Sequence, residues 1–186
     1  MNILIFLKNL IQLLLSPGHA WSDIEEEQQP VQKIIQRGLY PLMAVMLVTV
    51  FIRPLYSPDN FQLIPLLQKA LVQFVALFIA LYGARNIMEH FLTRYNCTGE
   101  KDPVAVGTVA TYGTGLMTLF QIAENVIPVE LTLTQLLPAF AAVCVWKADK
   151  YLDVEPSSEM KYMLICVASL IVPVVGINFI MSFIIS

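Results

Sequence analysis

Charged side chains are scarce in this chain: aspartate, glutamate, lysine and arginine make up 13% of its 186 residues, and hydrophobic residues make up 57%. Soluble domains carry roughly 25% charged residues, so the charge is too sparse to cover a water-soluble surface. The same figures exclude a disordered chain, a collagen-like repeat and a disulfide-rich secreted scaffold. A net charge of −3 without a run of lysine or arginine argues against nucleic-acid binding. An integral membrane protein is the class that remains.

Motifs for enzymatic chemistry are also missing. The chain has no phosphate-binding glycine loop, no HExxH sequence and no nucleophile elbow. Glu89 and His90 are adjacent but lack further residues that would complete a metal site. Cys97, Cys144 and Cys166 do not have the spacing of a disulfide or zinc motif. We therefore expect no enzyme, no catalytic residue, no metal site and no cofactor.

Long apolar stretches separate the few charges. A helix needs about 20 apolar residues to cross a bilayer, and five segments can reach that length. They are residues 38–56, 61–84, 103–127, 129–147 and 161–185. A soluble bundle is the weaker alternative, because so small a protein has little interior in which to bury five apolar helices. The prediction is an all-α, polytopic membrane bundle of five transmembrane helices at 38–186, with a cytoplasmic or interfacial N-terminal segment at 1–37.

The lysines and arginines predict how these segments are oriented. Nine of the eleven lie before the first span, between the second and third spans, or between the fourth and fifth spans and at the facing ends of those two. Only Arg53 and Lys69 fall on the opposite side. Because positive residues accumulate on the cytoplasmic side of membrane proteins, we expect a cytoplasmic N-terminus and an outside C-terminus.

The first 16 residues predict an amphipathic helix. On a helix, Lys8, Asn9, Gln12 and Ser16 form one polar stripe, and the remaining positions are mostly apolar. A cleaved signal peptide is the alternative, but it would place its positive charge ahead of the apolar stretch, and Lys8 lies in the middle. A retained helix in the membrane interface is the preferred interpretation.

An acidic helix is expected to follow. Ser22 and Glu25 have the spacing of a capping box, and Glu25, Glu26 and Glu27 would place negative charge in a first helical turn, where the helix dipole favours it. With Trp21, these carboxylates are a candidate cytoplasmic docking surface for a protein partner. The alternative is an ordinary solvated helix start.

Several short motifs resemble the Yip-domain family (Ypt-interacting proteins), particularly its bacterial branch. The resemblance lies in SPGHAWSDI, with Pro17, Trp21 and Ile24, in Tyr40-Pro41-Leu42, in the small residues from Ala105 to Tyr112, and in the segment from Pro128 through Trp146 to Lys161. The likeness implies five membrane helices with a cytoplasmic N-terminus, in a bacterial cytoplasmic (inner) membrane. Eukaryotic relatives associate with small GTPases through a longer N-terminal region, and that property is not carried over to this short segment.

Polar residues inside the predicted spans are candidate functional groups, because burying them in hydrocarbon is costly. In the predicted topology they form a layer in the outer half of the bilayer, comprising Lys69, Gln73, Gln121, Glu124, Asn125, Gln135 and Asn178. One hypothesis is a polar cavity open to the outside, with Lys69 paired to Glu124. The other is a structural clamp in which amides hold the helices together.

Prolines and small residues bear on the same choice. Pro65, Pro138 and Pro173 fall inside spans, where each is expected to remove a backbone hydrogen bond. Broken helices can build substrate sites in transporters, although membrane helices also tolerate kinks without such a role. Gly107, Thr111 and Gly115 recur at four-residue spacing, which predicts close packing against another helix.

Two functions follow from these patterns. The first is a non-enzymatic membrane organiser or adaptor that acts through its cytoplasmic helix and through the lipid bilayer. The second is a small transporter or channel that uses the polar layer. The expected partners are lipid and a protein bound at the N-terminal helix, and assembly into a homo-oligomer is left open.

Overall fold

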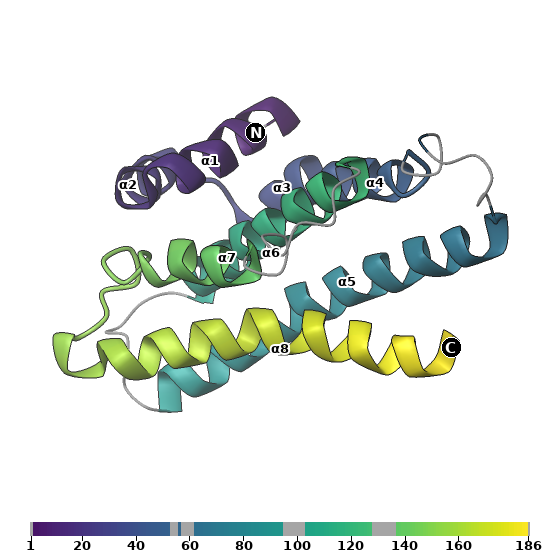
Figure 1. The fold of residues 1–186 in the computed structure, drawn as a ribbon. Helices are drawn as coiled ribbons and strands as arrows, with labels where there is room; N and C mark the ends of the chain where they lie inside the picture. The colour runs from purple at the N-terminus through teal and green to yellow at the C-terminus, as the bar shows by residue number, and fades with distance from the viewer. Residues whose placement is uncertain (1, 53–55, 57–61, 95–102, 128–136, 186) are drawn as a thin grey trace.

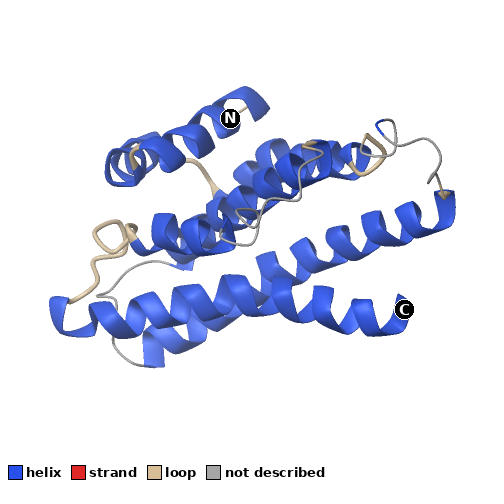
Figure 2. Ribbon diagram, in the orientation of Figure 1, coloured by secondary structure: helices blue, strands red, loops and turns tan. Residues whose placement is uncertain are grey.

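The computed structural model describes residues 2–52, 56, 62–94, 103–127 and 137–185. Within these ranges the chain consists of helices joined by turns, without a strand (Figures 1 and 2). The longer elements are α1 (Ile3–Leu15), α2 (Pro17–Glu27), α3 (Val31–Ile34), α4 (Tyr40–Thr49), α5 (Leu63–Arg94), α6 (Pro103–Val126), α7 (Leu137–Trp146) and α8 (Glu159–Ile185). The predicted all-α class is therefore confirmed.

One continuous helix stands where the first apolar span was expected, but its ends differ. It starts at Val31 after Pro30, passes from α3 through a π-helical segment η1 (Ile35–Leu39) into α4, and ends at Thr49. It thus begins and ends earlier than the predicted 38–56. The helix starts earlier because Lys33 and Arg37 interrupt the apolar run but are good helix formers.

The other helices follow the predicted segments more closely. The bounds of α6 and α8 lie within two residues of the predicted 103–127 and 161–185. α7 ends at Trp146, and the predicted residues 129–136 lie outside the described part of the chain. α5 continues past residue 84 to Arg94, and an Arg85–Glu89 pair at i,i+4 spacing stabilises this extension.

Consecutive helices run in alternating directions. Val31 approaches Gly107 at the start of α6, and Thr49 approaches Asn125 at its end, so α3–α4 and α6 are parallel. Tyr40 bonds to Tyr82 late in α5, which makes α5 antiparallel to α4. α8 packs along α5 in the opposite direction (Figure 1). This up-and-down order is common in helical bundles.

Small residues allow the closest approaches between helices. A Cβ atom at Gly115 would lie 2.8 Å from the Phe6 ring, and one at Gly107 would lie 3.3 Å from Val31. A Cβ atom at Gly38, in the π-helical segment, would lie 2.6 Å from Cγ at the base of the same Phe6 ring. These distances confirm the packing predicted from the stripe on α6.

The prolines interrupt the helices less than expected. Pro65 lies in the first turn of α5, where backbone N–H groups have no intrahelical acceptor. Pro138 is the second described residue of α7. Pro173 alone lies in a helix interior among the described residues. The prediction that all three remove helical hydrogen bonds is therefore wrong for Pro65, which lies in a first helical turn, where proline is tolerated.

A single helix of the described chain, α5, is long and apolar enough to cross a membrane, whereas α1 is apolar but shorter. The outward positions of α5 carry a row of exposed large apolar side chains: Leu63, Ile64, Leu67, Leu71, Val75 and Ile79. Such a row is unusual for a surface in contact with water. The five-span bundle stays a prediction.

Candidate functional site

Three helices meet at a buried cluster of polar side chains, which we call the amide cluster (Thr49, Gln73 and Asn125). The Asn125 side-chain N–H₂ donates to Gln73 Oε1 at 3.1 Å, and the Gln73 N–H₂ donates to Asn125 Oδ1 at 3.4 Å. Asn125 also donates to Thr49 Oγ1, which itself donates to the Met46 carbonyl at 2.6 Å. Asn125 is fully buried. The cluster thus joins α4, α5 and α6 through satisfied polar groups.

The other predicted members of the polar layer lie in different settings. Gln121 is one helical turn before Asn125 and is buried, with its Oε1 unpartnered within the described chain. Glu124 is exposed on α6, and Lys69 is half-buried on α5. Gln135 lies outside the described residues, and Asn178 is described only as part of the α8 backbone. The Lys69–Glu124 ion pair stays a prediction.

Trp21 is buried in the protein and is only 2% exposed. Its indole N–H donates to the Cys144 carbonyl at 2.9 Å. Its ring stacks on Tyr151 and meets the edge of Tyr112 at a centroid distance of 6.0 Å. The docking surface expected to include Trp21 therefore lacks it, because the indole fixes α2 to α6 and α7 instead.

Asn9 and Gln12, two of the four residues in the polar stripe of α1, turn toward the protein, whereas Lys8 is exposed. Asn9 is 2% exposed and donates to the Tyr112 hydroxyl at 3.0 Å and to Glu27 at 3.3 Å. Gln12 donates to Asp23 on α2. Leu4, Ile11 and Leu15 are exposed on the outer side. For Asn9 and Gln12, partners on α2 and α6 replace the water that the stripe was expected to meet.

The three consecutive glutamates lie at the opposite end of their helix from the one predicted. α2 begins at Pro17, so Glu25, Glu26 and Glu27 occupy its last turn, and Ser22 bonds to the Gly18 carbonyl inside the helix. The capping-box prediction is therefore wrong, because Pro17 already supplies a favourable first helical residue. The carboxylates stand at the negative end of the helix dipole, which is unfavourable.

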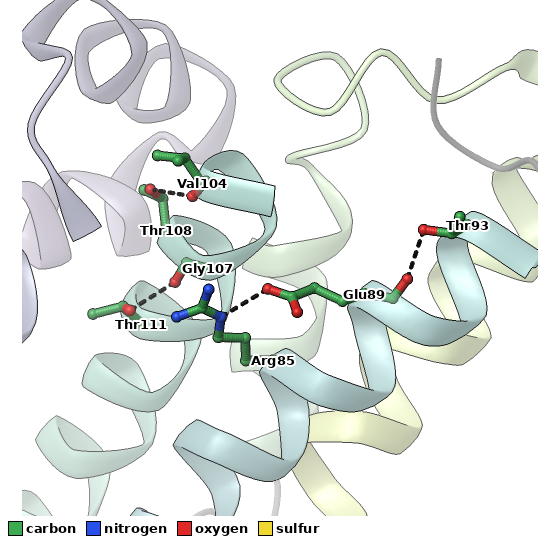
Figure 3. A network of polar contacts seen from close by, with 7 residues as sticks. All are labelled: Arg85, Glu89, Thr93, Val104, Gly107, Thr108 and Thr111. Atoms are coloured by element: carbon green, nitrogen blue, oxygen red, sulfur yellow. Dashed lines mark hydrogen bonds and ion pairs between the residues drawn. The ribbon is translucent and has the colours of Figure 1, made fainter. Parts of the chain in front are cut away.

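A second polar region lies where α5 approaches the start of α6 (Figure 3). Arg85 donates to Glu89 at 2.7 Å, and Thr93 bonds to the Glu89 carbonyl. Thr108 and Thr111 on α6 donate to carbonyls of the preceding turn, at Val104 and Gly107. These bonds satisfy the polar groups within each helix. The threonine hydroxyls of α6 therefore need no partner on another helix, and a neighbouring helix can pack closely against them.

Some residues of the site were not predicted from the sequence. Thr49 and Asn9 complete buried hydrogen bonds with partners that are distant along the chain. Their only local signal is a polar side chain within an otherwise apolar segment. Among the described residues, no group of three or more histidine, cysteine, aspartate or glutamate side chains could hold a metal ion.

Comparisons of this chain with protein-family models, curated proteins and solved structures found no match.

Proposed function

We propose that this chain is a non-enzymatic integral membrane protein of the Yip type, acting as a membrane organiser or adaptor. In this proposal the bundle lies in a bacterial cytoplasmic membrane with its N-terminus in the cytoplasm. The N-terminal helical hairpin (α1 and α2) is the element that meets lipid and a protein partner.

The docking of this hairpin is the observation that carries the proposal. Trp21 and Asn9 fix it to α6 and α7, while Glu25 and Glu26 remain exposed beside the anchored surface. An exposed acidic turn held rigidly by a buried aromatic anchor loses little entropy when a basic partner binds. This pre-organisation favours an adaptor over a solvated helix start.

The outer face of α1 supports contact with lipid. Leu4 is 69% exposed and Leu15 is 81% exposed. The helix has 13 residues, which corresponds to about 20 Å and is shorter than the ~30 Å apolar core of a bilayer. We place α1 within the cytoplasmic leaflet, where its apolar outer side contacts acyl chains.

The amide cluster supports a structural role within the bundle. Gln73 and Asn125 satisfy each other and are buried, so neither amide is presented to a passing solute. Amide pairs of this kind hold membrane helices together. The cluster is therefore interpreted as a clamp, in preference to the lining of a transport path.

The alternating helices bring most basic residues to one end of the bundle. The starts of α3, α6 and α8 and the ends of α5 and α7 share this end, which carries Lys33, Arg85, Arg94, Lys147 and Lys161. This asymmetry supports a cytoplasmic location for that end.

Two assays on the purified protein test the adaptor proposal. Reconstituted in liposomes, the chain should cause no ion or solute flux. Cross-linked in cells, it should retain a partner that is lost from the Glu25→Gln/Glu26→Gln variant and kept by Glu155→Gln, an exposed glutamate elsewhere. Flux that depends on Lys69 or Asn125 would establish the transporter alternative and refute the adaptor.

A further inference from the structure

A cavity of about 520 Å³ lies between the end of α2, the start of α3 and the start of α6. Small-molecule sites commonly have volumes of about 300–1,000 Å³. The cavity is separate from the amide cluster, because its α6 wall lies between Val104 and Tyr112, whereas Asn125 lies at the other end of that helix. It has the size of a ligand site at the end of the bundle proposed to be cytoplasmic.

The walls of the cavity are negatively charged. Glu25 and Glu27 line it, and no lysine, arginine or histidine is among its described lining residues. Gln29 also lines it, and its Oε1 is buried without a hydrogen-bond partner in the described part of the chain. A wall with two carboxylates fits a ligand that carries positive charge and hydrogen-bond donors.

The α2 helix places these carboxylates against its own electrostatic preference. Glu25 and Glu27 lie in its last turn, where the partial negative charge of the helix end opposes them. Gln28 follows with φ of 42°, a left-handed conformation that glutamine adopts at a cost. A bound cation would relieve the first of these unfavourable features.

The remaining walls indicate which kind of cation fits. Tyr151 is half-buried and contributes an aromatic side chain, and Val104 contributes exposed apolar surface, while Tyr112 and Ile34 are buried behind them. Aromatic faces attract organic ammonium groups, and apolar walls accommodate attached methylene groups. A bare metal ion fits poorly, because no cluster of three or more ligating side chains is present among the described residues.

We propose that this cavity binds an alkylammonium group, with Glu27 as the main counter-charge and Tyr151 and Val104 against its alkyl portion. The group is supplied by the ethanolamine headgroup of a lipid or by a free amine in the cytoplasm. The site goes beyond the adaptor function and does not depend on it.

Trp21 provides a direct signal for binding, because its ring stacks on Tyr151 with a centroid distance of 5.5 Å. The full chain carrying Trp146→Phe keeps Trp21 as its sole tryptophan. Titration of this protein with n-butylammonium chloride, in a maltoside detergent and phosphate buffer, should change the Trp21 fluorescence saturably. Sodium chloride at equal ionic strength should not.

Matched variants test the role of charge and shape. Glu27→Gln should weaken butylammonium binding about tenfold or more, because a charged hydrogen bond is lost. Glu26→Gln removes the same charge from an exposed neighbour that does not line the cavity, and it should bind like the parent. Ala105→Leu narrows the cavity without altering charge and should also weaken binding. Equal affinity in Glu27→Gln and Glu26→Gln, with both variants folded, would overturn the proposal.

Varying the lipid composition distinguishes the two sources of the ammonium group, the lipid headgroup and a free amine. In nanodiscs of phosphatidylglycerol, butylammonium should bind as it does in detergent. If added phosphatidylethanolamine weakens that binding, the lipid headgroup is the occupant, and if it has no effect, a free amine is. Absence of any saturable fluorescence change in both detergent and nanodiscs would refute the site.

Discussion

At the residue scale, the two tryptophans show how one side-chain type serves opposite roles. Trp21 donates its indole N–H to the Cys144 carbonyl, whereas Trp146 has a buried indole N–H without a partner in the described chain. A buried donor without an acceptor is a cost, and a satisfied one is a gain. The same substitution should therefore lower stability at position 21 but not at position 146.

We predict that Trp21→Phe lowers the free energy of unfolding by about 1 kcal/mol, since it removes one hydrogen bond and keeps most of the ring contacts. Trp146→Phe should leave stability unchanged or raise it. Denaturant titration in detergent micelles measures both. Equal losses in the two variants would show that ring size, and not the Cys144 hydrogen bond, determines the effect.

Asn125 is the second residue at which a single change is informative. Asn125→Leu leaves the Gln73 amide buried without its partner, which should cost about 1–3 kcal/mol. The double variant Gln73→Leu/Asn125→Leu should be less destabilised than the sum of the single variants, because no orphaned amide remains. Asn86→Leu, at an exposed position on α5, serves as the control. Strict additivity would contradict the clamp.

At the scale of the elements, the position of α1 depends on two glycines in the helices that it packs against. The Phe6 ring fits between Gly38 in the π-helical segment and Gly115 on α6. Its ring centroid also lies 5.1 Å from that of Tyr112. The π-helical segment provides the wider turn that brings Gly38 to this ring, and such segments commonly mark functional positions.

We predict that Gly38→Ala destabilises the protein by about 1–3 kcal/mol, because the added Cβ would overlap the Phe6 ring. Gly83→Ala on α5 has no atom within 4 Å of its new Cβ and should stabilise the helix by about 0.5–1 kcal/mol. Thermal unfolding in detergent compares the two. Limited proteolysis should detect release of α1 from the bundle in Gly38→Ala, together with its loss of stability, and should detect no release in Gly83→Ala.

At the scale of the whole molecule, the alternating helices place residue 62 and residue 157 at opposite ends. Gln62 precedes α5, and Ser157 is exposed in the turn before α8. In the proposed topology the first position is outside the cell and the second is in the cytoplasm. The charge asymmetry of the two ends is the physical reason for this orientation.

We predict that a membrane-impermeant thiol reagent labels Gln62→Cys in intact cells, in a chain whose native cysteines are replaced by alanine. Ser157→Cys should be labelled only after the cells are lysed. Labelling of both variants in intact cells would contradict the proposed orientation.

The sequence alone was sufficient to predict the all-helical class, the approximate positions of α5, α6 and α8, and the close packing at Gly115. These features depend on the length of apolar runs and on local spacing, which are properties of neighbouring residues. The end of α2 at which the glutamates lie was predicted wrongly, because the predicted helix began at Ser22, whereas Pro17 is its first residue.

Only the tertiary structure decided which polar groups meet. Asn9 bonds to Tyr112 across 103 positions of sequence, and Trp21 bonds to Cys144 across 123. Local periodicity identified a polar stripe on α1 but did not indicate which side faces the bundle. That choice is made by the hydrogen-bond partners that α2 and α6 offer, since a buried polar group is stable only where another element supplies its partner.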